Sequence, residues 1–231
     1  LMGGQAVRQA LRQDLGVWRL DAPAHPDGDG ALDQVRIENI LGSLSSLRAQ
    51  AWLDGVSTPL AREWRVEVAP GGGASEVAER VLRVHEGCQA TVEGLRPFRL
   101  GARACEILAG DLLFDDPLRH WLRASNTVQA RSVGDEFSVL LRRSPEGWRT
   151  SEGAVLDELW QARLSEWMRL RSVGIRGGER PGPAVYELDL QRTDAAPVRV
   201  SLGRGWLAVE GSPWFYALEL PAVRSPGEDS P

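Results

Sequence analysis

Residues 198–211 read VRVSLGRGWLAVEG, and residues 81–94 read VLRVHEGCQATVEG. In both stretches apolar and polar residues alternate, which is typical of β-strands with one buried face. Val81 aligns with Val198, and the Val-Glu-Gly at the end of each stretch keeps the same offset of 117 residues. A constant offset between two such stretches is the signature of an internal repeat. The spacing predicts two diverged copies of one unit.

Each copy also carries a Gly-x-Trp-Arg or Gly-Trp-Arg motif, around Trp18 and Trp148, followed by an amphipathic pattern. Apolar residues recur every three or four positions over residues 31–47 in the first copy and residues 154–170 in the second. This period predicts a helix with one apolar stripe in each copy. The run Asp-Gly-Asp-Gly at 27–30 places a carboxylate where it can cap the first helix.

Strand patterns follow each helix. The expected strands are residues 64–68, 80–84 and 88–94 in the first copy, and 185–190, 198–202 and 206–211 in the second. The matching hairpin turns are expected at residues 71–73 and 193–195. A joining segment is expected to hold a helix over 101–114, ended by Asp-Asp-Pro at 115–117, and a hairpin of 127–131 with 137–142.

These patterns together predict an α+β architecture of two tandem repeats, each an amphipathic helix packed on a mostly antiparallel sheet. Repeat unit 1 is expected at residues 1–123 and repeat unit 2 at residues 124–223. Residues 224–231 are rich in Ser, Pro, Gly and Glu, so they are expected to form a disordered tail.

The composition excludes several classes of function. The 231 residues carry a net charge of −5, and all 27 basic residues are Arg. Without Lys, neither a Walker A phosphate loop nor Schiff-base chemistry is available. The basic residues form no stripe, which argues against nucleic-acid binding. No apolar run approaches the ~20 residues of a membrane-spanning helix. No signal peptide is recognised, so any anchor or signal is expected outside this chain.

The sequence contains no recognisable catalytic or metal-binding motif. The three His residues lie in different predicted elements, without the spacing of a zinc site. No Gly-x-Ser-x-Gly elbow occurs. The adjacent Asp115 and Asp116 are better explained by a helix end than by a glycosidase acid pair. Residues 25–30 resemble a calcium loop, but the first and twelfth loop positions would be His25 and Arg36, which is the wrong chemistry for Ca²⁺. We therefore expect no catalytic residue, no metal and no cofactor.

Two sets of residues remain as candidate sites. Cys88 and Cys105 would permit one disulfide in an oxidising compartment, or they are two small buried apolar residues. Trp206, Trp214 and Tyr216 combine aromatic rings with polar ends, which suits glycan stacking or a protein interface. The alternative for these aromatic residues is packing in the core.

Motifs in both copies resemble domain of unknown function 4340. They are GVWRLDAP at 16–23, LGSLSSLRA at 41–49, LLFDD at 112–116, EGWR at 146–149 and VEG at 209–211. Members of that family are typically bacterial, with an N-terminal membrane anchor and an extracytoplasmic repeat region. Many look like accessory components beside ABC exporter permeases of the gliding-motility type. The family has no known catalytic residues, so the resemblance assigns none here.

The resemblance implies a non-catalytic, extracytoplasmic accessory or scaffold module of a membrane transport or gliding-motility-like complex. Its partner would be a membrane permease or another envelope protein. Localisation would be periplasmic, with an inner-membrane anchor outside this chain. A Cys88–Cys105 disulfide would then be expected. The alternative from the residues is a glycan- or peptidoglycan-binding module with exposed Trp and Tyr side chains, and a third hypothesis is a hydrolase with a carboxylate pair.

Overall fold

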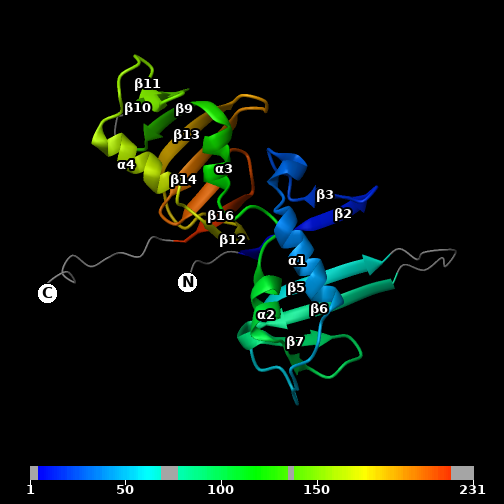
Figure 1. Ribbon diagram of the computed structural model, residues 1–231. Coiled ribbons are helices and arrows are strands. Elements are labelled where there is room, and N and C mark those ends of the chain that lie inside the picture. The colour runs from blue at the N-terminus through cyan, green and yellow to red at the C-terminus, as the bar shows by residue number, and fades with distance from the viewer. Residues whose placement is uncertain (1–4, 69–77, 135–137, 220–231) are drawn as a thin grey trace, which may run out of the picture. The chain divides into compact units, whose positions relative to one another are not determined.

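The computed structural model describes residues 5–68, 78–134 and 138–219 (Figure 1). The fold is mixed α+β with antiparallel sheets, so the predicted α+β class is confirmed. The chain divides into two compact units. One comprises residues 1–32 with 113–231, and the other comprises residues 33–112. We call them the discontinuous unit and the inserted unit.

In its described residues, 33–68 and 78–112, the inserted unit contains two α-helices, one 3-10 helix and a five-stranded sheet in the order β4-β8-β7-β6-β5. Its elements are α1 (Gln34–Ser45), β4 (Ala51–Trp52), β5 (Leu60–Val68), β6 (Ala78–His85), the 3-10 helix η2 (Glu86–Cys88), β7 (Gln89–Val92), β8 (Phe98–Arg99) and α2 (Ala102–Ala109). The carboxylate of Asp33 accepts a hydrogen bond from the Arg36 backbone N–H at 3.0 Å, which caps the start of α1. α1 packs on α2, and α2 packs on β5 and β6.

The core of the inserted unit is small and mainly aliphatic. Its buried apolar side chains are those of Ile37, Ile40, Leu82, Val84, Ala90, Phe98, Leu100, Leu108 and Leu112. A disulfide joins Cys88, at the end of η2, to Cys105 in α2, with their Cα atoms 5.5 Å apart. The indole Nε1 of Trp64 donates to the Leu108 carbonyl at 2.9 Å, which ties β5 to the same helix. Helix α2 is therefore held by a covalent bond as well as by packing.

The discontinuous unit contains a nine-stranded sheet in the order β1-β12-β16-β15-β14-β13-β9-β10-β11, and a separate β2-β3 hairpin. The strands are β1 (Gln5–Ala6), β2 (Ala10–Asp14), β3 (Val17–Ala22), β9 (Ser125–Ser132), β10 (Ser138–Ser144), β11 (Gly147–Thr150), β12 (Ser172–Gly177), β13 (Ala184–Arg192), β14 (Val198–Gly203), β15 (Trp206–Val209) and β16 (Trp214–Leu218). The helices are η1 (Gly28–Ala31), α3 (Pro117–Ala124) and α4 (Glu158–Trp167).

The core of the discontinuous unit is rich in large aromatic side chains. Trp121 of α3 and Trp167 of α4 are fully buried. Trp206 packs with Ala208 and Phe215 in a cluster on the sheet. Gly203 lies under the Trp206 ring so closely that a Cβ atom at position 203 would overlap it. Position 203 therefore requires glycine because the Trp206 ring leaves no room for a side chain, and not because of its backbone conformation.

Several expected elements differ from the observed ones. The predicted strands are present, with bounds that differ by a few residues. The predicted helices at 31–47, 101–114 and 154–170 are all shorter, since they correspond to α1, α2 and α4. The expected cap in the run 27–30 is wrong, because Asp33 caps α1. Helix α3 was not predicted: Asp-Asp-Pro at 115–117 begins a helix, with Pro117 in its first turn, where proline is favoured.

The predicted boundary after residue 123 does not coincide with the observed division of the chain. Strand β1 pairs with β12, and Leu32 forms a β-bridge with Leu113. The N-terminal segment thus belongs with the C-terminal part of the chain, which places residues 1–32 in the discontinuous unit. The expected Gly-rich turn at 71–73 and the expected tail at 224–231 lie outside the described residues.

The two hairpins that suggested a repeat differ by one residue in their turns. His85 pairs with Gln89 in the first, whereas Gly203 pairs with Trp206 in the second. When β7 is aligned with β15 at the offset of 117, the buried Leu82 corresponds to Val200, not to Arg199. The predicted equivalence of Val81 and Val198 is therefore off by one position, because the η2 turn holds an extra residue.

Candidate functional site

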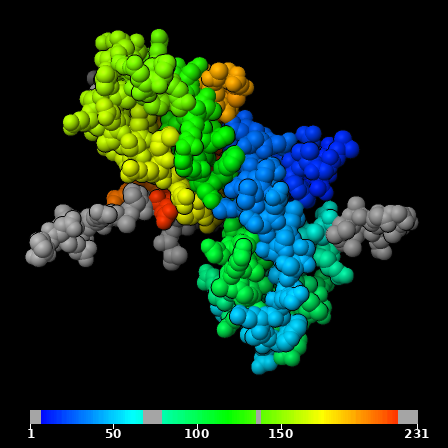
Figure 2. Space-filling model, viewed as in Figure 1, coloured from blue at the N-terminus to red at the C-terminus, as the bar shows by residue number. Residues whose placement is uncertain are grey.

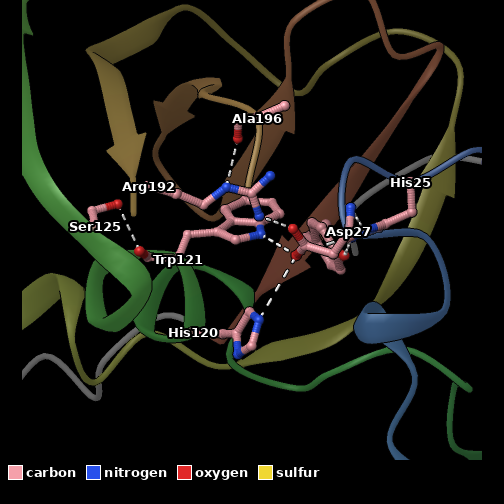
Figure 3. Close-up of polar contacts among 8 residues, drawn as sticks. His25, Asp27, His120, Trp121, Ser125, Arg192 and Ala196 are labelled. Carbon is pink, nitrogen blue, oxygen red and sulfur yellow. Dashed lines mark hydrogen bonds and ion pairs between the residues drawn. The ribbon is translucent and has the colours of Figure 1, made fainter. Parts of the chain in front are cut away.

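A polar cluster lies inside the discontinuous unit, and all of its side chains except that of His120 are buried (Figure 3). We call it the Asp27 cluster. It consists of His25, Asp27, His120, Trp121, Arg192 and Tyr216. The first two residues follow β3, the next two lie on α3, and the last two lie on β13 and β16. Segments far apart in sequence therefore supply one connected set of polar groups.

Local hydrogen bonds position Asp27 at the start of η1. The carboxylate of Asp29 accepts from the Leu20 backbone N–H at 2.7 Å and from Arg19 Nη1 at 3.2 Å. These bonds fix the η1 turn against β3. The Asp27 side chain does not cap η1 itself. Its carboxylate is instead used for contacts far along the chain.

The Asp27 carboxylate is almost completely buried, with 7% of its side chain exposed. Its Oδ2 accepts from the indole Nε1 of Trp121 at 2.5 Å, and its Oδ1 pairs with Arg192 Nη1. The Arg192 side chain is 3% exposed, and its Nε donates to the Ala196 carbonyl at 2.7 Å. Burial lowers the pKa of Arg192. Because a buried charge is tolerated only when it is paired, these two residues depend on each other.

His25 is neutral and has a defined tautomer. The Asp27 backbone N–H donates to His25 Nδ1 at 3.1 Å, so Nδ1 carries no proton. His25 Nε2 therefore holds the proton and donates it to the Tyr216 hydroxyl at 2.7 Å. Burial lowers the pKa of His25 to about 4, and the charges of His120 and Arg192 act in the same direction. The ring also stacks on Trp214, with centroids 5.9 Å apart.

His120 gives the cluster its access to solvent. Its side chain is 41% exposed, and its Nε2 lies 3.9 Å from Asp27 Oδ2. The ring stacks on Phe114, with centroids 4.9 Å apart. Nearby, the Ser125 hydroxyl donates to the Trp121 carbonyl at 2.8 Å, so it is not directed at a histidine. Across the described residues, no group of three or more His, Cys, Asp or Glu side chains is arranged to hold a metal ion.

The geometry of the Asp27 cluster suits a structural role. The Asp27 carboxylate bonds to the Trp121 indole and to the Arg192 guanidinium within the cluster. The His25 side chain is only 2% exposed. Arg192 Nη2 is buried without a hydrogen-bond partner among the described residues. The cluster ties the segment after β3 to α3 and to the end of β13. We therefore interpret it as a clamp on the N-terminal segment.

The structure buries the aromatic residues that were considered as a binding surface. Trp206, Trp214 and Tyr216 are 2%, 4% and 1% exposed. They offer no platform to a ligand, so the surface interpretation is corrected in favour of core packing. Their rings contact core neighbours: Trp206 packs on Phe215, while Trp214 and Tyr216 surround His25.

Sequence reasoning did not identify the Asp27 cluster. Asp27 was expected, with Asp29, to cap the first helix, because a carboxylate can accept hydrogen bonds from the amides of the first turn. Its partner Arg192 lies 165 residues away, and no local pattern links the two. The one available signal was a Trp on the buried face of a short amphipathic helix, because a buried indole N–H requires an acceptor. Helix α3 had not been predicted, so that signal was missed.

Comparisons with protein-family models, with curated proteins and with solved structures find no match to this chain. The resemblance to domain of unknown function 4340 thus stays a prediction. Among the helices that the structure describes, none combines the length and hydropathy needed to cross a bilayer.

Proposed function

We propose that this chain is a non-catalytic binding module that acts outside the cytoplasm. Its role would be that of an accessory or scaffold part of a membrane transport or gliding-motility-like complex, with a permease or another envelope protein as partner. The observation that carries the proposal is the Cys88–Cys105 disulfide. Disulfides persist in oxidising compartments and are rare in the cytosol, so the bond favours an extracytoplasmic site of action.

The Asp27 cluster supports a module without catalysis. A general base must reach a substrate proton, and a nucleophile needs an adjacent base. His25 is enclosed and already bonded to Tyr216, and Asp27 is bonded to Trp121 and Arg192. Because these polar groups bond to each other, their arrangement favours a structural role over a catalytic one.

We also propose that the chain arose from a duplicated unit. The five-stranded order β4-β8-β7-β6-β5 recurs in the larger sheet as β12-β16-β15-β14-β13. A helix precedes each set, α1 in one and α4 in the other, and a hairpin precedes each helix. Trp18 and Trp148 lie in the second strand of these hairpins. An experimental structure tests the proposal, because the two sets of strands must superpose with Leu82 on Val200.

The glycan-binding alternative has lost the residues on which it was based. It required exposed rings at Trp206, Trp214 and Tyr216, and these side chains are buried. Protein contacts require no such platform, because interfaces are built from mixed polar and apolar surface.

Thiol labelling tests the compartment. In cells that make the full-length protein, a maleimide–polyethylene glycol reagent should leave Cys88 and Cys105 unlabelled until a reductant is added. The same sample after reduction is the control and should gain two labels. If both thiols are labelled before reduction, the protein lies in a reducing compartment and the extracytoplasmic proposal fails.

Crosslinking tests the partner. The tagged full-length protein, crosslinked in intact cells and purified in mild detergent, should retain a permease or another integral envelope protein. The matched control is an untagged strain treated in the same way. Recovery of the protein alone, with no envelope protein enriched over that control, would contradict the scaffold role.

A further inference from the structure

A second site lies on the surface of the discontinuous unit, apart from the Asp27 cluster. It is a pocket of about 410 Å³ between α3 and the chain that follows α4. The lining residues are Asp116, Arg119, Arg123, Met168, Arg169 and Arg171. In Figure 2 the green surface of α3 borders the yellow surface of the chain that follows α4. We call this site the arginine pocket.

The arginine pocket has a strong excess of positive charge. Four guanidinium groups line it against one carboxylate. That carboxylate, on Asp116, accepts from Arg119 Nη1 at 3.1 Å. The exposed Arg123, Arg169 and Arg171 form no ion pair with any other residue that the structure describes. Three positive charges therefore line the pocket without a counterion among the residues that the structure describes.

This arrangement differs from other exposed arginines of the chain. Arg65 and Arg199 each contact two carboxylates. In the arginine pocket, Arg119 and Arg123 are four residues apart on α3, a spacing at which like charges destabilise a helix. Arg123 gains from its position in the last turn of α3, where a cation is favourable. That benefit accounts for Arg123, and the ion pair with Asp116 accounts for Arg119, which leaves the charges of Arg169 and Arg171 unexplained.

We propose that the arginine pocket binds a phosphate-type oxyanion. Guanidinium groups match the oxygens of a phosphate with two parallel hydrogen bonds, and several of them together suit a multiply charged group. The volume falls within the range of roughly 300–1,000 Å³ for small-molecule sites, so the pocket has room for a group esterified to the phosphate. Met168 adds an apolar contact for that group. The ligand is a soluble phosphate ester or the headgroup of an anionic lipid, which share this chemistry.

Two binding assays with the complete chain test the proposal and separate the two sources. Calorimetric titration with glycerol 3-phosphate measures binding of a soluble phosphate ester. Co-sedimentation with phosphatidylcholine vesicles, with or without phosphatidic acid, measures binding of a lipid headgroup. Saturable binding in the first assay identifies a soluble ligand. Binding only to vesicles with phosphatidic acid identifies a lipid.

The variant Arg123→Gln/Arg171→Gln should weaken the observed binding about tenfold or more, because charge-assisted hydrogen bonds to the oxyanion are lost. Arg204→Gln is the matched control: it removes an exposed arginine in the turn between β14 and β15, remote in sequence from the pocket residues. It should bind as the wild type does. Circular dichroism should show unchanged folding for both variants. If neither probe binds, or if Arg204→Gln weakens binding equally, the proposal is overturned.

Discussion

The five strands of the inserted unit follow the same order as five of the strands in the discontinuous unit, but the two units are stabilised differently. In the inserted unit the largest fully buried side chains are aliphatic, among them Ile37 and Leu108, while Trp52 is 56% exposed. In the discontinuous unit Trp121, Trp167 and Trp206 are buried. Small cores commonly need a covalent link, and the disulfide lies in the smaller unit. The same strand order is thus stabilised by a disulfide in the inserted unit and by aromatic packing in the discontinuous unit.

The polar interior shows the same contrast. The discontinuous unit encloses the charged pair Asp27–Arg192, at 7% and 3% exposure. The ion pair Arg62–Asp111 of the inserted unit is more accessible, at 20% and 10%. A larger core can shield a charged pair from water. The stability of the fold then depends on both partners, because removing one leaves the other charge buried and unpaired. We therefore expect the discontinuous unit to depend on the Asp27–Arg192 pair and the inserted unit to depend on its disulfide.

The largest effect is expected from Asp27→Ala. The substitution leaves the buried Arg192 charge unpaired, and breaking a buried pair in this way costs about 3–5 kcal/mol. The free energy of unfolding in urea, followed by Trp fluorescence, should fall by that amount. Asp54→Ala is the control. It removes a fully exposed carboxylate paired with an exposed Arg96, and should change stability by less than about 0.5 kcal/mol. If Asp27→Ala lowers the free energy of unfolding no more than the control does, the Asp27 cluster is dispensable for stability.

Acid should destabilise the discontinuous unit through His25. Its pKa is about 4 in the folded state and 6.5 when unfolded, so between these values the unfolded chain binds more protons. The contribution of neutral His25 is complete above pH 6.5 and is lost as the pH falls to about 4. The two-and-a-half-unit difference corresponds to about 3 kcal/mol. His25→Gln should flatten the dependence of unfolding free energy on pH over this window. A profile parallel to that of the wild type would rule out His25 as its source.

Loss of the disulfide should act on the inserted unit alone. Cys88 and Cys105 are 17 residues apart, and closing a loop of this size stabilises a fold by about 3 kcal/mol. In Cys88→Ser/Cys105→Ser, amide hydrogen exchange should accelerate in α2 and β7. Amides in β14 and β15 of the discontinuous unit serve as an internal control and should keep their rates. Similar acceleration in both units would mean that they do not depend on separate devices.

The sequence was informative where periodicity is local. Alternation over 198–202 located β14, which begins with buried and more exposed residues in turn. The strand expected at 206–211 is present as β15, but it is apolar and buried along most of its length, so it has no polar face. Helix α3 was missed because Pro117 was interpreted as a stop, although proline is equally compatible with a helix start. The Asp27–Arg192 pair could not be predicted, since no periodic pattern links residues in different elements. The one-residue difference between the hairpins was also missed. The extra residue in the first turn is offset by one residue fewer in the strand before it, so the two aligned stretches keep the same length.

The edge strands give the last and smallest effect. In the described residues β5 pairs with β6 alone, whereas the corresponding β13 pairs with both β14 and β9. Exposed charges on β5, including Arg65 and Glu67, protect an open edge from pairing with another chain. Arg65→Thr/Glu67→Thr should therefore form dimers as concentration rises, seen by light scattering after size exclusion. Stability of the monomer should change by no more than about 0.5 kcal/mol.

The matched control for the edge removes the charged pair Arg131 and Glu187, which face each other on β9 and β13. Both of these strands are already paired on both sides, so Arg131→Thr/Glu187→Thr leaves no open hydrogen-bonding groups and should stay monomeric. Dimers of both variants would assign association to lost surface charge rather than to an open edge. A β5 variant that stays monomeric at the same concentrations would show that its charges do not guard that edge. The difference between β5 and β13 would then have no consequence for assembly.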